Sequence, residues 1–326
     1  MTAPVSRDLE IAEITDRVSK GPAEKNLALL FENVQGFTTP VLINAFGSSE
    51  RMAAALGVER LDELSARVAK LLDLRMPGSF FDKLRKLGDL FDVAKAGPSA
   101  CAPPPARKWS RRTGRRSPRC PSSAAGRETP GATSRSPWCS RAIPSRGRAM
   151  SACTACRSST TRRSACTGRS HKGSAEHHRV AEEQKKPMEV AVALGGDPCS
   201  IYAGSAPLPP GIDEMVFSGW LRGSGVPMVA CKTVDLEVPA EAEIVLEGWV
   251  DPAERRLEGP FGDHTGYYSL ARDYPVFHLK AITRRKSPIY PTTIVGRPPR
   301  KTTGSARPPS ASSCPSFASS CPRSWT

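Results

Sequence analysis

The chain has 326 residues, a formal net charge of +15 and ten cysteines, and its length allows two domains with hydrophobic cores. The positive charge is confined to residues 98–170, with 16 basic residues and one acid, and residues 300–326, with four basic residues and no acid. Residues 1–97 and 171–299 carry net charges of −1 and −3, which argues against a nucleic-acid-binding domain in either.

Cysteine usage and hydropathy indicate the compartment. Eight of the ten cysteines fall in the two basic segments, and only Cys199 and Cys231 lie elsewhere, which suits a reducing cytoplasm. The first residues have no apolar core like that of a signal peptide, and no run approaches about 18 apolar residues. We therefore expect a cytoplasmic protein without a membrane span.

Residues 1–97 have the patterning of an α/β domain. Apolar spacing predicts helices over 8–18, 48–56, 61–72 and 80–93, and strands over 27–31 and 40–43.

Residues 98–170 lack periodicity and consist mainly of Ser, Arg, Pro, Ala, Cys and Thr. One interpretation is a disordered basic linker. The other is an aberrant segment translated in the wrong frame of a GC-rich gene. With free choice of third bases, residues 150–159 can be back-translated so that a shifted frame encodes VGMYRMQVF, which alternates like a strand.

The tail, residues 300–326, has the same unusual composition, and a shifted frame can encode an amphipathic helical sequence there. We therefore expect frame disruptions near residues 98 and 300, with the original frame restored at about His171.

Residues 171–299 are again well patterned and form a second candidate domain. Strands are predicted over 188–194, 243–250, 276–282 and 289–295, separated by Gly, Pro and Asp turns, with a helix near 212–222.

The segment Glu258-Gly-Pro-Phe-Gly-Asp263-His-Thr-Gly-Tyr-Tyr268 concentrates groups that can do chemistry. Its Gly-Pro-Phe-Gly turn can direct the carboxyls of Glu258 and Asp263 toward one pocket, where a carboxylic acid can deliver a proton. The alternative is a β-hairpin with solvated acids.

Two Gly-rich turns, 193–198 and 204–207, could cradle a phosphate with backbone amides, although most such turns are only turns. Glu214 opens a predicted helix, where a carboxylate is favoured by the helix dipole alone. A histidine such as His171 together with carboxylates would suit Mn²⁺ or Mg²⁺.

The chain resembles the UbiD-type decarboxylases in segments that occur in the same order: DLEIAEITDRV, LLFENVQGF, PVLINAFGS, HKGSAEHHR, VAVALGGDP, APLPPGIDE, CKTVDLEVPAEAEIVLEG, EGPFGDHTGYY and PIYPTTIVGRPP. The resemblance covers residues 8–97 and 171–299. It implies an α+β fold, with an N-terminal α/β domain followed by a split β-barrel that binds flavin. In this chain we expect the barrel to lack several strands and the C-terminal domain to be missing.

The resemblance also implies chemistry. UbiD-type enzymes are carboxy-lyases that use prenylated FMN to remove CO₂ reversibly and without oxidation from aromatic or α,β-unsaturated acids, here in ubiquinone or menaquinone biosynthesis. The implied ion is Mn²⁺, with K⁺ as an additional candidate. The implied partners are a small carboxylic acid, a flavin prenyltransferase that supplies the cofactor and further copies of the chain, with peripheral membrane association through a polyprenyl substrate left open and no nucleic acid.

The family's roles map onto individual residues. Asp263 protonates the substrate carbon, and Glu258 holds the substrate and an arginine of the catalytic network. The metal ligands are Glu214 and His171. The residues that bind the cofactor are His171, Lys172, Ser205, Ala206, Pro207 and Glu214.

The chain departs from this pattern where the family's metal-binding Asn and catalytic Arg fall, because both lie in the shifted-frame peptide N-V-G-M-Y-R. We therefore expect an inactive and unstable polypeptide. Two other functions are open: a flavin- or nucleotide-binding module without catalysis, and a nucleic-acid binder that uses the basic segment, whose aromatics are limited to Trp109 and Trp138.

Overall fold

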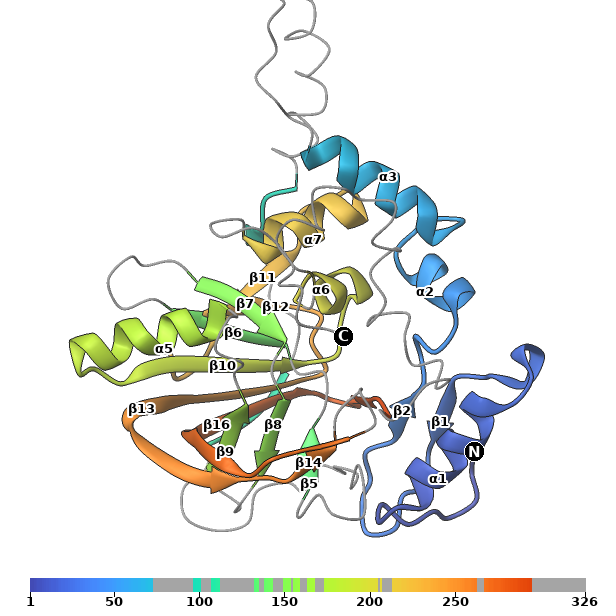
Figure 1. Ribbon diagram of the computed structural model, residues 1–326, viewed down its shortest axis with the longest axis horizontal. Coiled ribbons are helices and arrows are strands. Elements are labelled where there is room, and N and C mark those ends of the chain that lie inside the picture. Colours follow the sequence, from blue (N-terminus) through green and yellow to red (C-terminus); the bar gives the residue numbers. More distant parts are fainter. Residues whose placement is uncertain are drawn as a thin grey trace, which may run out of the picture.

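A computed structural model gives the fold of the chain (Figure 1). It describes residues 1–72, 96–100, 107–111, 132–134, 138–142, 149–153, 155–158, 163–167, 173–204, 206, 213–262 and 267–294. The predicted helix over 80–93 and the whole tail lie outside these residues.

The N-terminal segment forms the elements that its apolar spacing predicts. They are α1 (Glu10–Lys20), β1 (Leu29–Phe31), β2 (Val41–Ile43), α2 (Ser49–Ala55) and α3 (Leu61–Leu72), and a short 3-10 helix that was not predicted, η1 (Ala23–Lys25), follows α1. Helix α1 has acids in its first turn and bases in its last, as its dipole favours. Helix α2 begins after Ser48, whose side chain accepts a hydrogen bond from the backbone of Arg51 at 3.2 Å.

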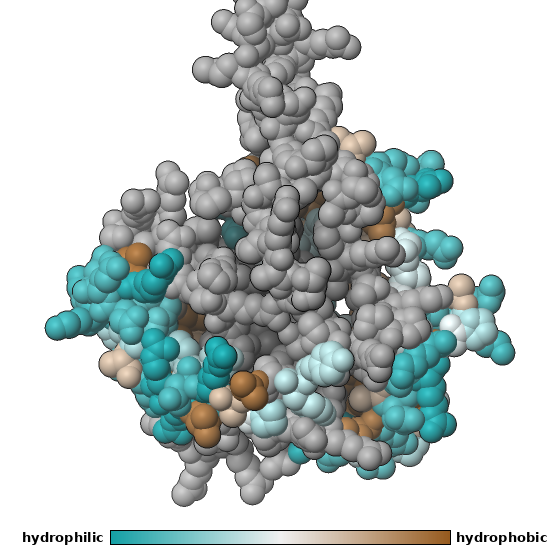
Figure 2. Space-filling model, viewed as in Figure 1, coloured by the Kyte–Doolittle hydropathy of each residue, from teal (hydrophilic) through white to brown (hydrophobic). Residues whose placement is uncertain are grey.

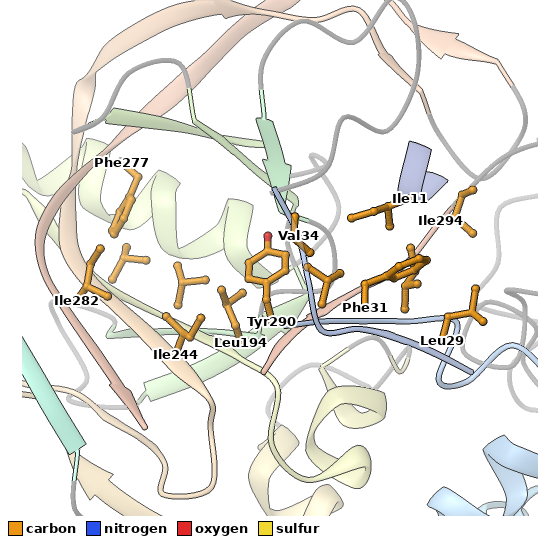
Figure 3. Close-up of a cluster of buried hydrophobic side chains, with 14 of the residues drawn as sticks. Ile11, Leu29, Phe31, Val34, Leu194, Ile244, Phe277, Ile282, Tyr290 and Ile294 are labelled. Atoms are coloured by element: carbon orange, nitrogen blue, oxygen red, sulfur yellow. The ribbon is translucent and has the colours of Figure 1, made fainter. Parts of the chain in front are cut away.

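The N-terminal and central segments share a small sheet. β1 pairs antiparallel with β2, and β17 (Tyr290–Thr292) pairs parallel with the other edge of β2. Their buried side chains form one cluster with those of the central sheet, and Figure 3 shows Tyr290 between Val34 and Leu194. The predicted strand over 289–295 is thus confirmed, and it joins the N-terminal sheet.

The central sheet is built around β10 (Met188–Leu194), β13 (Ile244–Glu258) and β16 (Arg272–Arg285), which pair antiparallel. β10 is apolar almost throughout because both of its faces are covered. Val190, Val192 and Leu194 face the cluster shared with the N-terminal segment. Ala191 and Ala193 face a second cluster with β11 (Pro227–Ala230) and β12 (Glu237–Pro239).

Residues 98–170 contribute strands, contrary to our expectation that the sheet would lack several of them. β6 (Trp138–Ala142) pairs with β10, and both β4 (Arg107–Arg111) and β9 (Arg163–Thr167) pair with β16. Strand pairing uses backbone groups, so a segment without hydrophobic alternation can still complete the open edges of β10 and β16. The remaining strands of this segment are β3 (Ser99–Ala100), β5 (Ala132–Ser134), β7 (Ala149–Cys153) and β8 (Ala155–Ser158).

Among the described strands, the large sheet runs in the order β5-β8-β9-β16-β13-β10-β6-β7, with β4 also on β16. Its two end strands are not paired with each other, so this part of the chain forms an open sheet and not a closed barrel.

Three helices accompany the sheet: α5 (Gly173–Gln184), α6 (Pro198–Ala203) and α7 (Glu214–Arg222). Hydrophilic residues dominate the visible surface over α1, α3 and α5 (Figure 2). None of the helices in the described ranges is long and apolar enough to span a bilayer.

Candidate active site

Glu258 is a buried acid at the end of a long strand. We predicted a strand that ends at residue 250, but β13 continues past an irregularity between Val250 and Arg255 and pairs Glu258 with Arg272 of β16. Glu258 is 4% exposed, whereas the preceding Leu257 is 74% exposed. The alternative of a hairpin with solvated acids is therefore wrong for Glu258.

Gly259 lets the chain turn directly after this acid. Its φ is +119°, and a Cβ at this position would lie 2.7 Å from the Cα of Ala271 on the opposite side of the turn. The short strands β14 (Phe261–Gly262) and β15 (Tyr268–Ser269) then pair as a hairpin. Asp263, the predicted proton donor, follows β14 and lies outside the described residues.

Helices α6 and α7 flank the predicted flavin segment. Ala206 packs against a cluster that contains residues of both helices, while Ser205 and Pro207 lie outside the described residues. Ser200 of α6 and Ser218 of α7 are buried and hydrogen-bonded at 2.9 Å between their hydroxyl oxygens. The helix before this segment in the chain and the helix after it are therefore held together by a buried hydrogen bond.

Glu214 is the first residue of α7 and is half-buried. Asp213 caps the start of the helix, and its carboxylate accepts a hydrogen bond from the backbone of Met215 at 2.7 Å. Helix α7 also lies against β7. The other predicted metal ligand, His171, and its neighbour Lys172 lie outside the described residues, and within those residues no three His, Cys, Asp or Glu side chains gather as a metal site.

Within the turn over 193–198, hydrogen bonds inside the chain occupy the amides that follow Asp197. Asp197 accepts a hydrogen bond from the backbone of Cys199 at 2.9 Å, and its carbonyl accepts one from Ser200 at 3.1 Å. The adjoining hollow of about 590 Å³ is lined by Asp197, Glu241 and Glu243, with Arg222 and Arg285 paired to these acids. None of the described candidate site residues lines it.

The sequence pattern did not reveal one connection in this region. Arg222, at the end of α7, forms an ion pair with Asp197 at 2.8 Å, which ties the end of α7 to the start of α6. Asp197 directly before a proline has the signal of a helix N-cap, but its long-range partner has no signal in the sequence. The neighbouring Cys199 thiol is buried, and burial together with Asp197 raises its pKa to about 12. This thiol therefore remains neutral and is not suited to act as a nucleophile or metal ligand.

Comparisons with known proteins agree on the family. The N-terminal domain model of the 3-octaprenyl-4-hydroxybenzoate carboxy-lyases matches residues 1–70, and the Rift-related domain model of the same enzymes matches residues 147–298. An uncharacterised protein of Archaeoglobus fulgidus is 41% identical over 90% of this chain, and one of Aquifex aeolicus is 38% identical over 91%. The chain spans 60% and 61% of the lengths of these two relatives.

Solved structures show the same relationship. The UbiD-class enzyme HmfF of Pelotomaculum thermopropionicum in complex with FMN is 26% identical, with a TM-score of 0.74 over 92% of this chain and 62% of that protein. An evolved dimeric form of HmfF in complex with prenylated FMN is also 26% identical, with a TM-score of 0.75 over 93% and 64% of the two chains. The vanillic acid decarboxylase of Sedimentibacter hydroxybenzoicus shares the fold, with a TM-score of 0.81 at 22% identity over 94% and 63%. The two family models together match more than half of the chain, which therefore belongs to the UbiD family of carboxy-lyases.

Proposed function

We propose that this fold serves the non-oxidative, reversible decarboxylation of an aromatic or α,β-unsaturated carboxylic acid with prenylated FMN. The observation that carries the proposal is the burial of Glu258 beside the Gly259 turn, in a chain whose relative HmfF binds FMN and prenylated FMN. A carboxyl removed from water and placed beside a glycine turn is suited to hold a substrate or to handle a proton.

Within this proposal, Glu258 orients the substrate and the arginine of the catalytic network, and Asp263 donates the proton that replaces CO₂. When bound, the modified flavin supplies the electron sink for the loss of CO₂. Ser205, Ala206 and Pro207 would pack along its ring, and His171 and Lys172 would lie at its phosphate.

The ion in the proposal is Mn²⁺, with K⁺ as a second candidate. The carboxylate of Glu214 fits such a hard ion, and α7, of which Glu214 is the first residue, lies against β7. β7 covers the residues where a shifted frame could encode the family's metal-binding Asn. A frame-restored chain would therefore carry this Asn on a strand that lies against α7, whereas β7 as translated reads Ala-Met-Ser-Ala-Cys and offers no Asn.

We therefore propose that the chain as translated does not catalyse the reaction, since it lacks both the Asn and the arginine of the family pattern. The test compares this chain with a variant in which compensating nucleotide changes restore the frame over residues 98–170. Each is supplied with prenylated FMN, Mn²⁺ and K⁺ and assayed for CO₂ release. Turnover by the restored variant alone supports the proposal, and turnover by the unchanged chain contradicts its second half.

Glu258→Gln in the restored variant tests the role of the buried acid. We expect a loss of activity on the order of 100-fold or more, because a neutral amide no longer pairs with the arginine or shares a proton. The matched control is Glu237→Gln, an exposed glutamate on β12, which should leave the rate unchanged. Equal activity of the two variants would remove Glu258 from the mechanism.

For the substrate, we propose a polyprenylated hydroxybenzoate or a related acid of quinone biosynthesis. The support is the activity for which the matching family models are named. Assaying 3-polyprenyl-4-hydroxybenzoate beside simple phenolic and furoic acids decides between these classes. Preference for a simple acid by more than about tenfold in kcat/KM, or about 1.4 kcal/mol, would overturn this assignment.

A further inference from the structure

The helices of the N-terminal segment divide between two hydrophobic clusters. Helix α1 and strands β1 and β2 pack with the central sheet, in the cluster of Figure 3. Met52 of α2, Leu56 directly after this helix and Leu64 of α3 belong to another cluster, shared with α6 and α7. In the described part of the chain, neither α2 nor α3 contributes to the first cluster. Figure 1 shows the same division, with α2 and α3 beside α6 and α7 and away from α1.

A polar network joins these two clusters. Its centre is Arg51, on the first turn of α2. The guanidinium donates from Nε to the carbonyl of Ala45 at 3.1 Å, from Nη2 to the carbonyl of Asn44 at 3.2 Å and from Nη1 to the carbonyl of Asn26. These acceptors are neutral backbone oxygens, and burial lowers the pKa of Arg51. One planar group thus connects α2 to the loops that lead into β1 and out of β2.

The loops are themselves interlocked by buried asparagines. Asn26 and Asn44 are each 2% exposed; Asn26 donates to the carbonyl of Gly47 at 2.8 Å, and Asn44 donates to the side-chain oxygen of Asn26 at 2.7 Å. Asn44 has a φ of +62°, and its side-chain oxygen would lie 1.8 Å from a Cβ at position 47. A larger residue at position 47 would displace the Asn44 side chain from this network, so the glycine and the buried asparagine fit together.

On its other side, the network leads to the candidate active site. Phe46 lies between Asn44 and Gly47 and packs against the cluster that contains Cys199 and Ala203 of α6 and Leu221 of α7. Arg67 of α3 adds a contact at 5.1 Å from the ring centre of Trp220 on α7. These helices flank the predicted flavin segment, and α7 begins at Glu214.

We propose that Arg51 is a positioning residue that sets the α6–α7 pair relative to the sheet, and with it the placement of Glu214. Lysine at position 51 would keep the charge but, as a single point donor, could not span the three carbonyls that the planar guanidinium holds. Each cluster would keep its own apolar contacts, so the loss of the network should loosen the helices without unfolding the sheet. The link to Glu214 rests on the proposed function. The mechanical part, which is the effect of Arg51 on how firmly the helices are held against the sheet, does not.

Hydrogen exchange of the full chain tests the mechanical part. In Arg51→Lys, we expect amides of α2 and α7 to exchange at least about tenfold faster, while β10 and the first half of β13 keep their protection. Arg17→Lys is the matched control, since Arg17 is 78% exposed and pairs with Glu13 one turn away on the surface. Unchanged exchange in α7, or an equal increase in all peptides, would overturn the proposal.

Binding of FMN in the presence of Mn²⁺, followed by quenching of flavin fluorescence, tests the link to the site. We expect the Kd of Arg51→Lys to rise about tenfold relative to the unchanged chain and to Arg17→Lys. Equal Kd values would show that the network does not reach the site. If the unchanged chain binds no FMN, the same Kd comparison in the frame-restored variant decides the link to the site, and the exchange result decides the mechanical role of Arg51.

Discussion

Two features of position 259 favour glycine, the positive φ and the close contact with Ala271, and the loss of stability from each can be measured. Its φ of +119° is strained for any other residue, and a Cβ would approach the Cα of Ala271 to 2.7 Å. We expect Gly259→Ala to lower the free energy of unfolding by about 2–4 kcal/mol, since a strained backbone costs roughly 1–3 kcal/mol and the clash adds to it.

Gly57 offers a control for the backbone requirement alone. Its φ is +67°, and a Cβ there would meet nothing within 4 Å. Gly57→Ala should therefore cost only about 1 kcal/mol. Urea unfolding of both variants measures the difference, and equal costs would mean that the turn after Glu258 relaxes freely and does not hold this acid in place.

The reactivity of the Cys199 thiol measures how well the cluster that it shares with α2 excludes water. Its pKa is raised to about 12, so on the order of one thiol in ten thousand is ionised at pH 8 in the folded protein. We expect iodoacetamide to label Cys199 only in denaturant, while Cys231, which is half-buried, reacts in the native chain. Mass spectrometry of the labelled peptides distinguishes these two sites from the other eight cysteines.

The raised pKa of Cys199 lowers the stability of the folded protein above pH 9. The unfolded thiol ionises near pH 9 and the folded thiol near pH 12, so the unfolded state loses its proton first. Stability from this group is complete below pH 9 and is lost as the pH rises toward 12. Cys199→Ala should remove this part of the alkaline loss; an unchanged pH profile would contradict the assignment.

At the scale of elements, sequence patterns predicted those structures whose own side chains alternate or repeat. Strand β10 occupies residues 188–194 as predicted, because both of its faces are covered and its sequence is apolar throughout. The second half of β13 was not predicted, because Arg255, Arg256 and Leu257 are exposed and show no alternation. Backbone pairing with β16 holds these residues in the strand.

The candidate site could also be predicted only in part from the sequence. The acids of residues 258–263 could be found from their spacing and their glycines. The burial of Glu258 could not be predicted, because its strand partner Arg272 on β16 is separated from it in the sequence by the turn and the hairpin. The network of Arg51 could not be predicted from the sequence pattern either, because three of the acceptors of Arg51 are backbone carbonyls, which every residue has.

At the scale of the whole molecule, the N-terminal and central segments share a core and should unfold together. Tyr290 is 1% exposed and lies in that core, and its backbone amide donates to the carbonyl of Pro40 at 2.8 Å. It follows the central sheet in the chain, yet its strand completes the sheet of β1 and β2. Among the described residues, the core that holds Tyr290 therefore receives side chains from both segments.

Tyr290→Ala tests this shared core. Removing a fully buried aromatic ring should cost about 3–5 kcal/mol, whereas Tyr267→Ala, at a side chain that is 75% exposed, should change stability by less than about 0.5 kcal/mol. Because the cavity opens between β2 and β10, hydrogen exchange should rise in both strands by the same factor. Faster exchange in β1 and β2 alone would mean that the N-terminal segment folds and unfolds independently. In that case the position of α2, and through it that of α6 and α7, could not depend on the central sheet through this core.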